Sequence, residues 1–280
     1  MKVWAIAKLG FKECLHYRIF YFILIMAVFF IFLGKSCTPQ MSTNNSMIID
    51  LKTQQNAAMK AGFHGIIFWS VMLCGLLSSN LLSKEEEEGT VAMTLSRPVS
   101  RAQFVAGKIL SVIMISTFNL ILLSGVFLFL FYVEMKQFNP SILLSFLIMV
   151  ISLILYALMT VALSFFIPRI AAPLVSMFIY LMTLWISLPA YFETIKYIWI
   201  PSSRIEMFYK FLPKFGDIQF IGASFIDVSL QNYDIIIVFM NALFYIIFFW
   251  FLILFLFKKR SFWEIIRKQI SVSWKDIYKF

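Results

Sequence analysis

Histidine and cysteine, which often build metal and hydrolytic sites, are scarce in this chain: its 280 residues include two His and three Cys. His16 and His64 stand far apart in the sequence, and neither belongs to a His-Glu-x-x-His pattern. The 15 Met residues are scattered, so packing explains them better than copper binding, and no nucleophile motif stands out among the Ser and Thr residues. The sequence therefore predicts no metal site and no catalytic centre in this chain.

The three cysteines share no close spacing. We expect Cys14 on one side of a membrane, Cys37 on the other side and Cys74 within it. Because these positions keep the three thiols apart, the sequence predicts no disulfide framework.

A nucleotide-binding motif is missing as well. A phosphate-binding loop needs two glycines that flank four residues, followed by Lys and Ser or Thr. Gly34, Lys35 and Ser36 copy the end of that motif, but Phe29 stands where the first glycine is needed. The chain therefore has no ATP site of its own.

Charged residues are also missing from the long apolar stretches. No Asp, Glu, Lys or Arg lies well inside any of them, whereas ion-coupled transporters place such groups at mid-membrane to bind the coupling ion. The polar residues that remain are expected to hydrogen-bond between helices; they include Asn119, Ser124, Thr160 and Asn241. The chain is thus expected to move or anchor something without an energy source of its own.

What the sequence has in abundance is apolar surface. Hydrophobic residues make up 61% of the chain, 33 of them are Phe, and the mean hydropathy is +0.88, so a soluble domain could not cover this surface. Six stretches approach or reach the length of about 20 residues that a membrane-spanning helix needs. They are roughly 19–34, 62–82, 109–133, 142–167, 170–191 and 235–257. The sequence predicts an all-α integral membrane protein, with one domain of six transmembrane helices over residues 1–280.

Lys and Arg set the orientation of these helices. If the N-terminus lies in the cytoplasm, the inner segments hold 16 of the 24 basic residues; these segments are 1–18, 83–108, 168–169 and 258–280. The positive-inside rule then favours an N-in and C-in topology. The same rule explains the net charge of +10 without a nucleic-acid partner.

Both ends of the chain have amphipathic patterns that predict interfacial helices lying in the membrane surface. The apolar positions at the N-terminus are Val3, Ile6, Ala7, Gly10, Phe11, Cys14 and Leu15, and the polar ones are Lys8, Lys12 and His16. At the C-terminus the apolar positions are Trp263, Ile266, Ile270, Trp274 and Ile277, with Arg267, Lys268 and Lys275 around them. Anchoring to anionic lipid is favoured over a specific partner site.

The segment 192–234 is the largest predicted outer loop. It contains aromatic residues that favour the headgroup level, and Pro201 and Pro213 are expected to interrupt any helix in it. The loop is interpreted either as a structural cap or as an exit gate for a substrate.

Residues 83–108, SKEEEEGTVAMTLSRPVSRAQFVAGK, form a polar segment between the second and third predicted spans. Ser83 and Glu86 have capping-box spacing, so a short helix is expected to begin there, with the glutamates in its first turns. Pro98 is expected to end that helix in a sharp turn. Ser100 and Gln103 repeat the spacing and predict a second helix that climbs into the third span.

Such a helix–turn–helix would present acidic, apolar and basic patches to the cytoplasm. A soluble partner could grip this shape and transmit force to two spans at once. The alternative is a solvated charged loop, which is what charge runs usually form.

Three short motifs follow each other in this segment: Glu-x-Glu-Gly-Thr, then Leu-Ser-x-Pro-x-Ser-Arg, then Gly-Lys at the start of a membrane helix. This order resembles the membrane subunits of ATP-binding cassette transporters of the second exporter type. In particular, it is similar to permeases associated with multicopper-enzyme maturation and gliding motility. The matching residues are Glu86, Glu88, Gly89, Thr90, Leu95, Ser96, Arg97, Pro98, Ser100, Arg101, Gly107 and Lys108.

The resemblance implies a non-catalytic permease subunit in a bacterial inner (plasma) membrane, paired with a second permease subunit, identical or related. Two separate ATPase subunits would bind beneath the pair and carry the ATP and Mg²⁺. The segment after the second span would be the coupling helix, in which Glu85 and Glu87 join the matching residues as candidate contacts with the ATPase. The scattered Met and His residues give no support to copper as a substrate.

Three functions follow from these observations. The favoured one is the permease of an ATP-driven exporter, whose apolar walls suggest a lipidic, amphipathic or peptide-like substrate by analogy. The second is a non-transporting membrane anchor for an ATPase in an envelope or motility complex. The third, an intramembrane enzyme, would need convergent polar side chains that the sequence does not show.

Overall fold

The computed structural model describes residues 2–36, 51–87, 100–135, 141–168, 170–191, 209, 211–227 and 235–277. Within these ranges the protein is helical and contains no strand, which confirms the all-α prediction. The helices are α1 (Lys2–Leu15), α2 (Arg18–Ser36), α3 (Leu51–Glu87), α5 (Arg101–Met135), α6 (Ser141–Ser164), α7 (Ala171–Tyr191), α10 (Phe215–Asp227) and α11 (Ile235–Ile277). Each of the six predicted spans coincides with a helix.

The described helices include four segments that are long and apolar enough to cross a membrane: Met59–Asn80, Ala102–Leu130, Ser141–Ser164 and Ile235–Lys258. A fifth would consist of Val3–Leu15 and Phe20–Ile31, which are bent by 65° at the break between them. The apolar part of α7, Ala171–Ser187, is shorter. The chain is therefore a multi-pass membrane protein, and the count of six spans stays a prediction.

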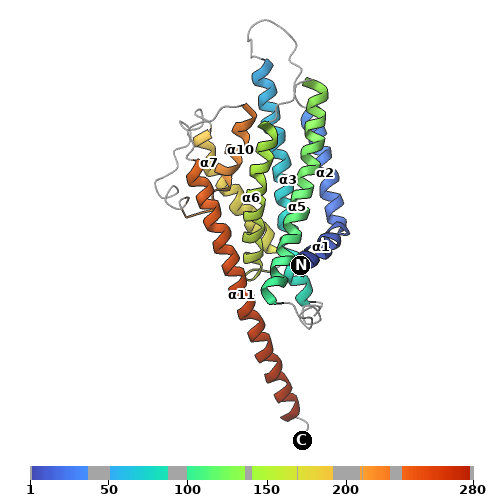
Figure 1. The fold of residues 1–280 in the computed structure, drawn as a ribbon, viewed down its shortest axis with the longest axis vertical. Coiled ribbons are helices and arrows are strands. Elements are labelled where there is room, and N and C mark those ends of the chain that lie inside the picture. The colour runs from blue at the N-terminus through green and yellow to red at the C-terminus, as the bar shows by residue number, and fades with distance from the viewer. Residues whose placement is uncertain are drawn as a thin grey trace.

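α3 and α6 lie at the centre of the bundle (Figure 1) and contact most of the other helices. Glycines bring backbones close at several of these contacts. A Cβ added to Gly75 would lie 2.8 Å from the hydroxyl oxygen of Tyr156, and one added to Gly222 would lie 2.8 Å from the methyl carbon of Met149. Helices in lipid usually associate by close approach at small residues. The burial of apolar side chains does not favour association there, because lipid tails are equally apolar.

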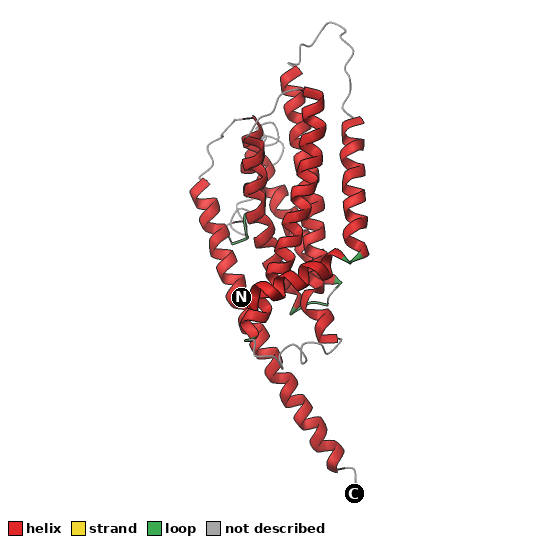
Figure 2. Cartoon of the chain, turned by 45° about the vertical axis from the view of Figure 1, so that its right-hand side comes forward, coloured by secondary structure: helices red, strands yellow, loops and turns green. Residues whose placement is uncertain are grey.

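α11 lies at the edge of the bundle and is the least buried of the four candidate spans. Below the bundle it continues as one helix to Ile277 (Figures 1 and 2). The predicted C-terminal interfacial helix is therefore wrong as a separate element. The reason is that no Gly or Pro occurs between Ile235 and Ile277 to interrupt the helix.

The segments predicted to face the cytoplasm gather at one end of the bundle. The N-terminal helix α1, the end of α3, the start of α5 and the extension of α11 all lie there (Figure 1). This common end agrees with the arrangement predicted from Lys and Arg, while the side of the membrane that it faces stays a prediction.

Candidate functional site

The coupling segment 83–108 begins inside α3. This helix runs through Ser83 to Glu87, so the prediction that a new helix begins at Ser83 is wrong. Residues 76–88 contain no Gly or Pro, and Leu, Lys and Glu are good helix formers, so nothing stops the helix at the end of the span. Glu85 to Glu87 consequently lie at the C-terminal end of a helix, where carboxylates oppose the helix dipole.

The middle of the coupling segment lies outside the described residues. This stretch, 88–99, contains seven of the candidate ATPase contacts, which are Glu88, Gly89, Thr90, Leu95, Ser96, Arg97 and Pro98. The turn predicted at Pro98 therefore stays a prediction.

The second capping box of the segment is confirmed. The Ser100 backbone N–H donates to Gln103 Oε1 at 3.2 Å, and the Gln103 N–H donates to Ser100 Oγ at 3.2 Å. α5 begins at the next residue, Arg101. The reciprocal bonds satisfy two backbone donors that a helix start otherwise leaves without partners.

Substituting Ser100→Ala removes one of these two bonds. We expect the first turn of α5 to loosen by about 1 kcal/mol, the usual contribution of a cap. Hydrogen–deuterium exchange of the amides in this turn should then be about fivefold faster. Ser100→Asp, which keeps an acceptor at the cap, is the control, and equal exchange in Ser100→Ala and the wild type would contradict the prediction.

The end of the coupling segment is joined to α1. Lys108 Nζ lies 3.0 Å from Glu13 Oε2 in an ion pair; the Lys108 side chain is 7% exposed and that of Glu13 is 50% exposed. Next to it, a Cβ added to Gly107 would lie 2.8 Å from Ile6 Cβ and 3.0 Å from the Val3 carbonyl oxygen. The candidate contacts Gly107 and Lys108 are thus buried against α1, whereas Ser100 is exposed.

α5 also covers the face of α1 that is predicted to lie in the membrane surface. Ala7, Gly10 and Cys14 of that face are buried, and Phe11 packs edge-on against Phe118 with ring centroids 6.0 Å apart. α1 and α5 form the most extensive contact between any two of the helices in the described part of the chain. The periodicity of α1 is confirmed, but protein covers its apolar face, because an apolar stripe alone does not distinguish protein from lipid.

A second candidate region lies where the predicted outer loop returns to the bundle. Residues 215–227 of that loop form α10, which begins two residues after Pro213 and packs against α6, α7 and α3. Nearly all its described side chains are buried. Gly216 permits this approach, because an added Cβ would lie 2.5 Å from the Thr183 carbonyl oxygen and 2.9 Å from Ser187 Cβ.

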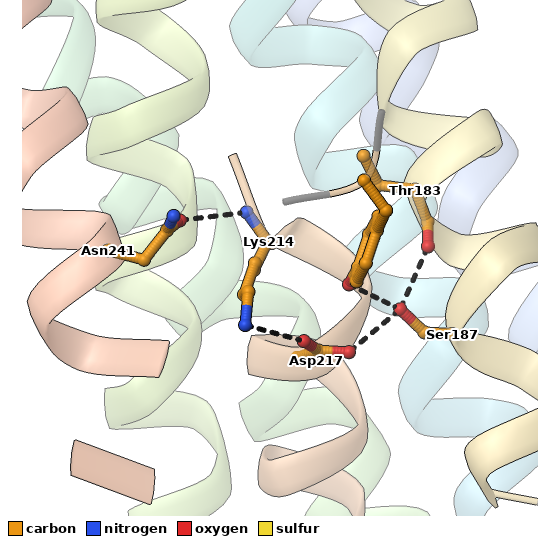
Figure 3. Close-up of polar contacts among 6 residues, drawn as sticks. Thr183, Ser187, Lys214, Asp217 and Asn241 are labelled. Carbon is orange, nitrogen blue, oxygen red and sulfur yellow. Dashed lines mark hydrogen bonds and ion pairs between the residues drawn. The ribbon is translucent and has the colours of Figure 1, made fainter. Parts of the chain in front are cut away.

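Polar contacts join the start of α10 to α7 and to α11 (Figure 3). Ser187 Oγ on α7 lies 2.9 Å from Asp217 Oδ1 and 2.8 Å from the Tyr209 hydroxyl. Asp217 Oδ2 is 4.0 Å from Lys214 Nζ, and the Lys214 N–H donates to Asn241 Oδ1 of α11 at 3.2 Å. The bundle therefore contains an ion pair that the predicted spans themselves lack.

A third polar contact lies deeper in the bundle. Gln219 of α10 bonds to Nδ1 of His64 on α3 at 2.6 Å and accepts a bond from the Tyr180 hydroxyl of α7. Nearby, Ser176 Oγ donates to the Tyr156 hydroxyl at 3.1 Å. On α7 the buried polar residues recur at helical spacing, a signal that the sequence contained and that the prediction missed; they are Ser176, Tyr180, Thr183 and Ser187.

The other polar residues predicted to bond between helices divide into two groups. Asn119 reaches Ser70 of α3 at 3.5 Å, and Asn241 reaches the start of α10. Ser124 and Thr160 instead donate to carbonyl groups of their own helices. Within the described ranges, no group of three or more His, Cys, Asp or Glu could hold a metal ion.

Comparison with known proteins places these features in one family. Residues 4–262 match the family model described as ABC-2 family transporter protein. The match begins in α1 and ends within α11, so it includes the coupling segment, its joint with α1, and α10. A search of curated proteins finds no match.

Proposed function

Because the chain belongs to the ABC-2 family of transporter proteins, we propose that it is the membrane-spanning permease subunit of an ATP-driven exporter. The observation that carries this proposal is the joint between the coupling segment and α1. Gly107 and Lys108 attach the start of α5 to α1, so a force on the segment would reach both helices together. In this proposal a separate subunit would hydrolyse ATP, since the sequence contains no phosphate-binding loop.

The lengths of the connected helices support this role. Segment 83–108 links α3, of 37 residues, to α5, of 35 residues, and each contains a candidate membrane span. A partner that pushes on the link would displace two helices that cross the bundle from end to end (Figure 2). α1 would follow, because it packs more extensively on α5 than on any other helix.

We propose the rest of the assembly by analogy with the family. Two ATPase subunits with ATP and Mg²⁺ would bind at the end of the bundle where the coupling segment lies, and a second permease subunit, identical or related, would complete the path. The chain would then have six spans with both termini in the cytoplasm, in a bacterial inner membrane. By analogy with such exporters, the substrate would be lipidic, amphipathic or peptide-like.

The experiment that tests this function needs no knowledge of the substrate. The protein is tagged at its C-terminus, extracted in mild detergent from its native host, and its stoichiometric companions are identified. We expect an ATPase with a phosphate-binding loop among them. Recovery of the protein alone, even after gentle cross-linking through residues 85–101, would overturn the proposal.

Reversing the charge of two glutamates tests whether the ATPase binds at segment 83–108. Glu86→Lys with Glu88→Lys should lower retention of the ATPase at least about tenfold, since opposite-charge contacts across an interface become like-charge contacts. The control is Glu134→Lys, a single charge reversal at the other end of α5, which should retain the ATPase at the wild-type level. Equal retention by the double variant would count against 83–108 as the docking segment.

A further inference from the structure

The outer face of α1 has a composition unlike the face that packs on α5. Trp4, Lys8 and Lys12 follow each other at intervals of four residues and therefore share one side of the helix. Leu9 flanks them. All four side chains are exposed, and Trp4 and Leu9 are each 58% exposed. Two large apolar side chains thus stand beside two lysines on one surface.

The charge of this surface is of one sign. Glu13 is the one acidic residue of α1, and it forms the ion pair with Lys108 of α5. Among the described residues no carboxylate forms an ion pair with Lys8 or Lys12. The outer face of α1 is therefore cationic, with no acidic side chain of its own helix left to balance it.

The position of α1 limits what this face can contact. α1 is bent by 65° from α2, and it crosses the outside of the bundle near the end where α3 stops and α5 starts (Figure 2). It contacts α5 at Gly107, Lys108 and Ser111, close to the beginning of the candidate span Ala102–Leu130. The helix therefore lies along the flank of the bundle at the level where the apolar span begins.

We infer that the outer face of α1, formed by Trp4, Lys8, Leu9 and Lys12, binds anionic lipid headgroups. Lysines near an anionic leaflet are attracted to it, and Trp favours the headgroup level, where its ring is half in apolar surroundings. Leu9 supplies an apolar contact with the upper acyl chains. A lipid surface fits better than a soluble protein, because the face lies beside the start of a span and exposes two large apolar side chains.

The test uses the full chain in nanodiscs of phosphatidylcholine that contain a small fraction of a brominated lipid, either phosphatidylglycerol or phosphatidylcholine. Bromine quenches nearby tryptophan emission, and the quenching lost in Trp4→Phe is the part due to Trp4. Each lysine near an anionic surface contributes about fivefold in preference for anionic lipid. We expect Trp4 to be quenched at least about threefold more strongly by brominated phosphatidylglycerol, and less so in high salt.

Charge variants test whether the preference for anionic lipid comes from this surface or from the total charge of the protein. Lys8→Gln with Lys12→Gln should bring the quenching of Trp4 by the two brominated lipids to the same level. Lys52→Gln with Lys60→Gln, at the start of α3 and hence at the opposite end of the bundle, is the matched control and should keep the preference. Lys8 and Lys12 are exposed, so the fold is expected to persist when both are substituted.

Two results would overturn the inference. One is equal quenching of Trp4 by the two brominated lipids in the wild type, or a preference that survives the Lys8 and Lys12 substitutions. The other is a Trp4 that neither lipid quenches and that becomes shielded when a co-purified ATPase is added, which would assign the face to a protein partner. Neither result depends on whether the chain transports a substrate.

Discussion

Substituting Gly216→Ala is expected to destabilise the protein by about 2 kcal/mol, within the usual range for adding atoms to a closely packed core. The new Cβ would collide with α7, 2.5 Å from the Thr183 carbonyl oxygen and 2.9 Å from Ser187 Cβ. A backbone oxygen does not move aside as the end of a long side chain does, so α10 itself must shift. The melting temperature in detergent should fall by about 5 °C.

Gly125→Ala is the matched control for this experiment. Gly125 also lies in a helix, but a Cβ added there meets nothing within 4 Å. Alanine is the better helix former by about 0.5–1 kcal/mol, so this variant should melt at or above the wild-type temperature. Equal melting temperatures for the two variants would show that α10 does not pack on α7 as described.

The ion pair between Lys108 and Glu13 should respond asymmetrically to substitution. Glu13→Gln removes the carboxylate that lies 3.0 Å from the ammonium group of Lys108, whose side chain is 7% exposed. We expect a loss of about 2–3 kcal/mol, because a buried charge is costly when it loses an ionic partner. Lys108→Met removes the buried charge and leaves a carboxylate that is 50% exposed, so this change should cost less than about 1 kcal/mol.

A double-mutant cycle measures this asymmetry. In the Lys108→Met background, Glu13→Gln should have almost no further effect on the melting temperature in detergent, because the cation that it affects is gone. Additive losses from the two substitutions would contradict the pairing. If α1 and α5 also move together in the working protein, Glu13→Gln should reduce the ATPase stimulation by the permease more than Lys108→Met does.

The sequence predicted the helical elements well, because long apolar stretches have few alternatives in lipid. It also predicted the start of α5, because Ser100 and Gln103 form a local motif whose two bonds involve only neighbouring residues. Motifs of this kind can be predicted without knowledge of the rest of the fold. The same spacing at Ser83 led to a wrong prediction. α3 continues through Ser83, because no Gly or Pro interrupts it there.

The features that the sequence did not predict all depend on contacts between distant segments. α10 is too short to span a membrane, and its sequence, FGDIQFIGASFID, could equally lie on a surface. Its burial depends on Gly216 and Gly222, whose neighbours lie on α7, α6 and α3. Likewise, Lys214 and Asp217 belong to the predicted outer loop, and only the fold brings Asp217 beside Ser187 and Lys214 beside Asn241.

Because α11 is one uninterrupted helix, the part beyond its membrane span can act as a lever. Its extension beyond Lys258, residues 259–277, is 19 residues long, which corresponds to about 29 Å at 1.5 Å per residue. An uninterrupted helix is stiff over this distance, so a tilt of the membrane part by about 10° would carry the far tip through about 5 Å. α11 is the least buried of the four candidate spans, so few contacts within this chain would oppose such a tilt, and a small rearrangement in the bundle would be amplified at the C-terminal end.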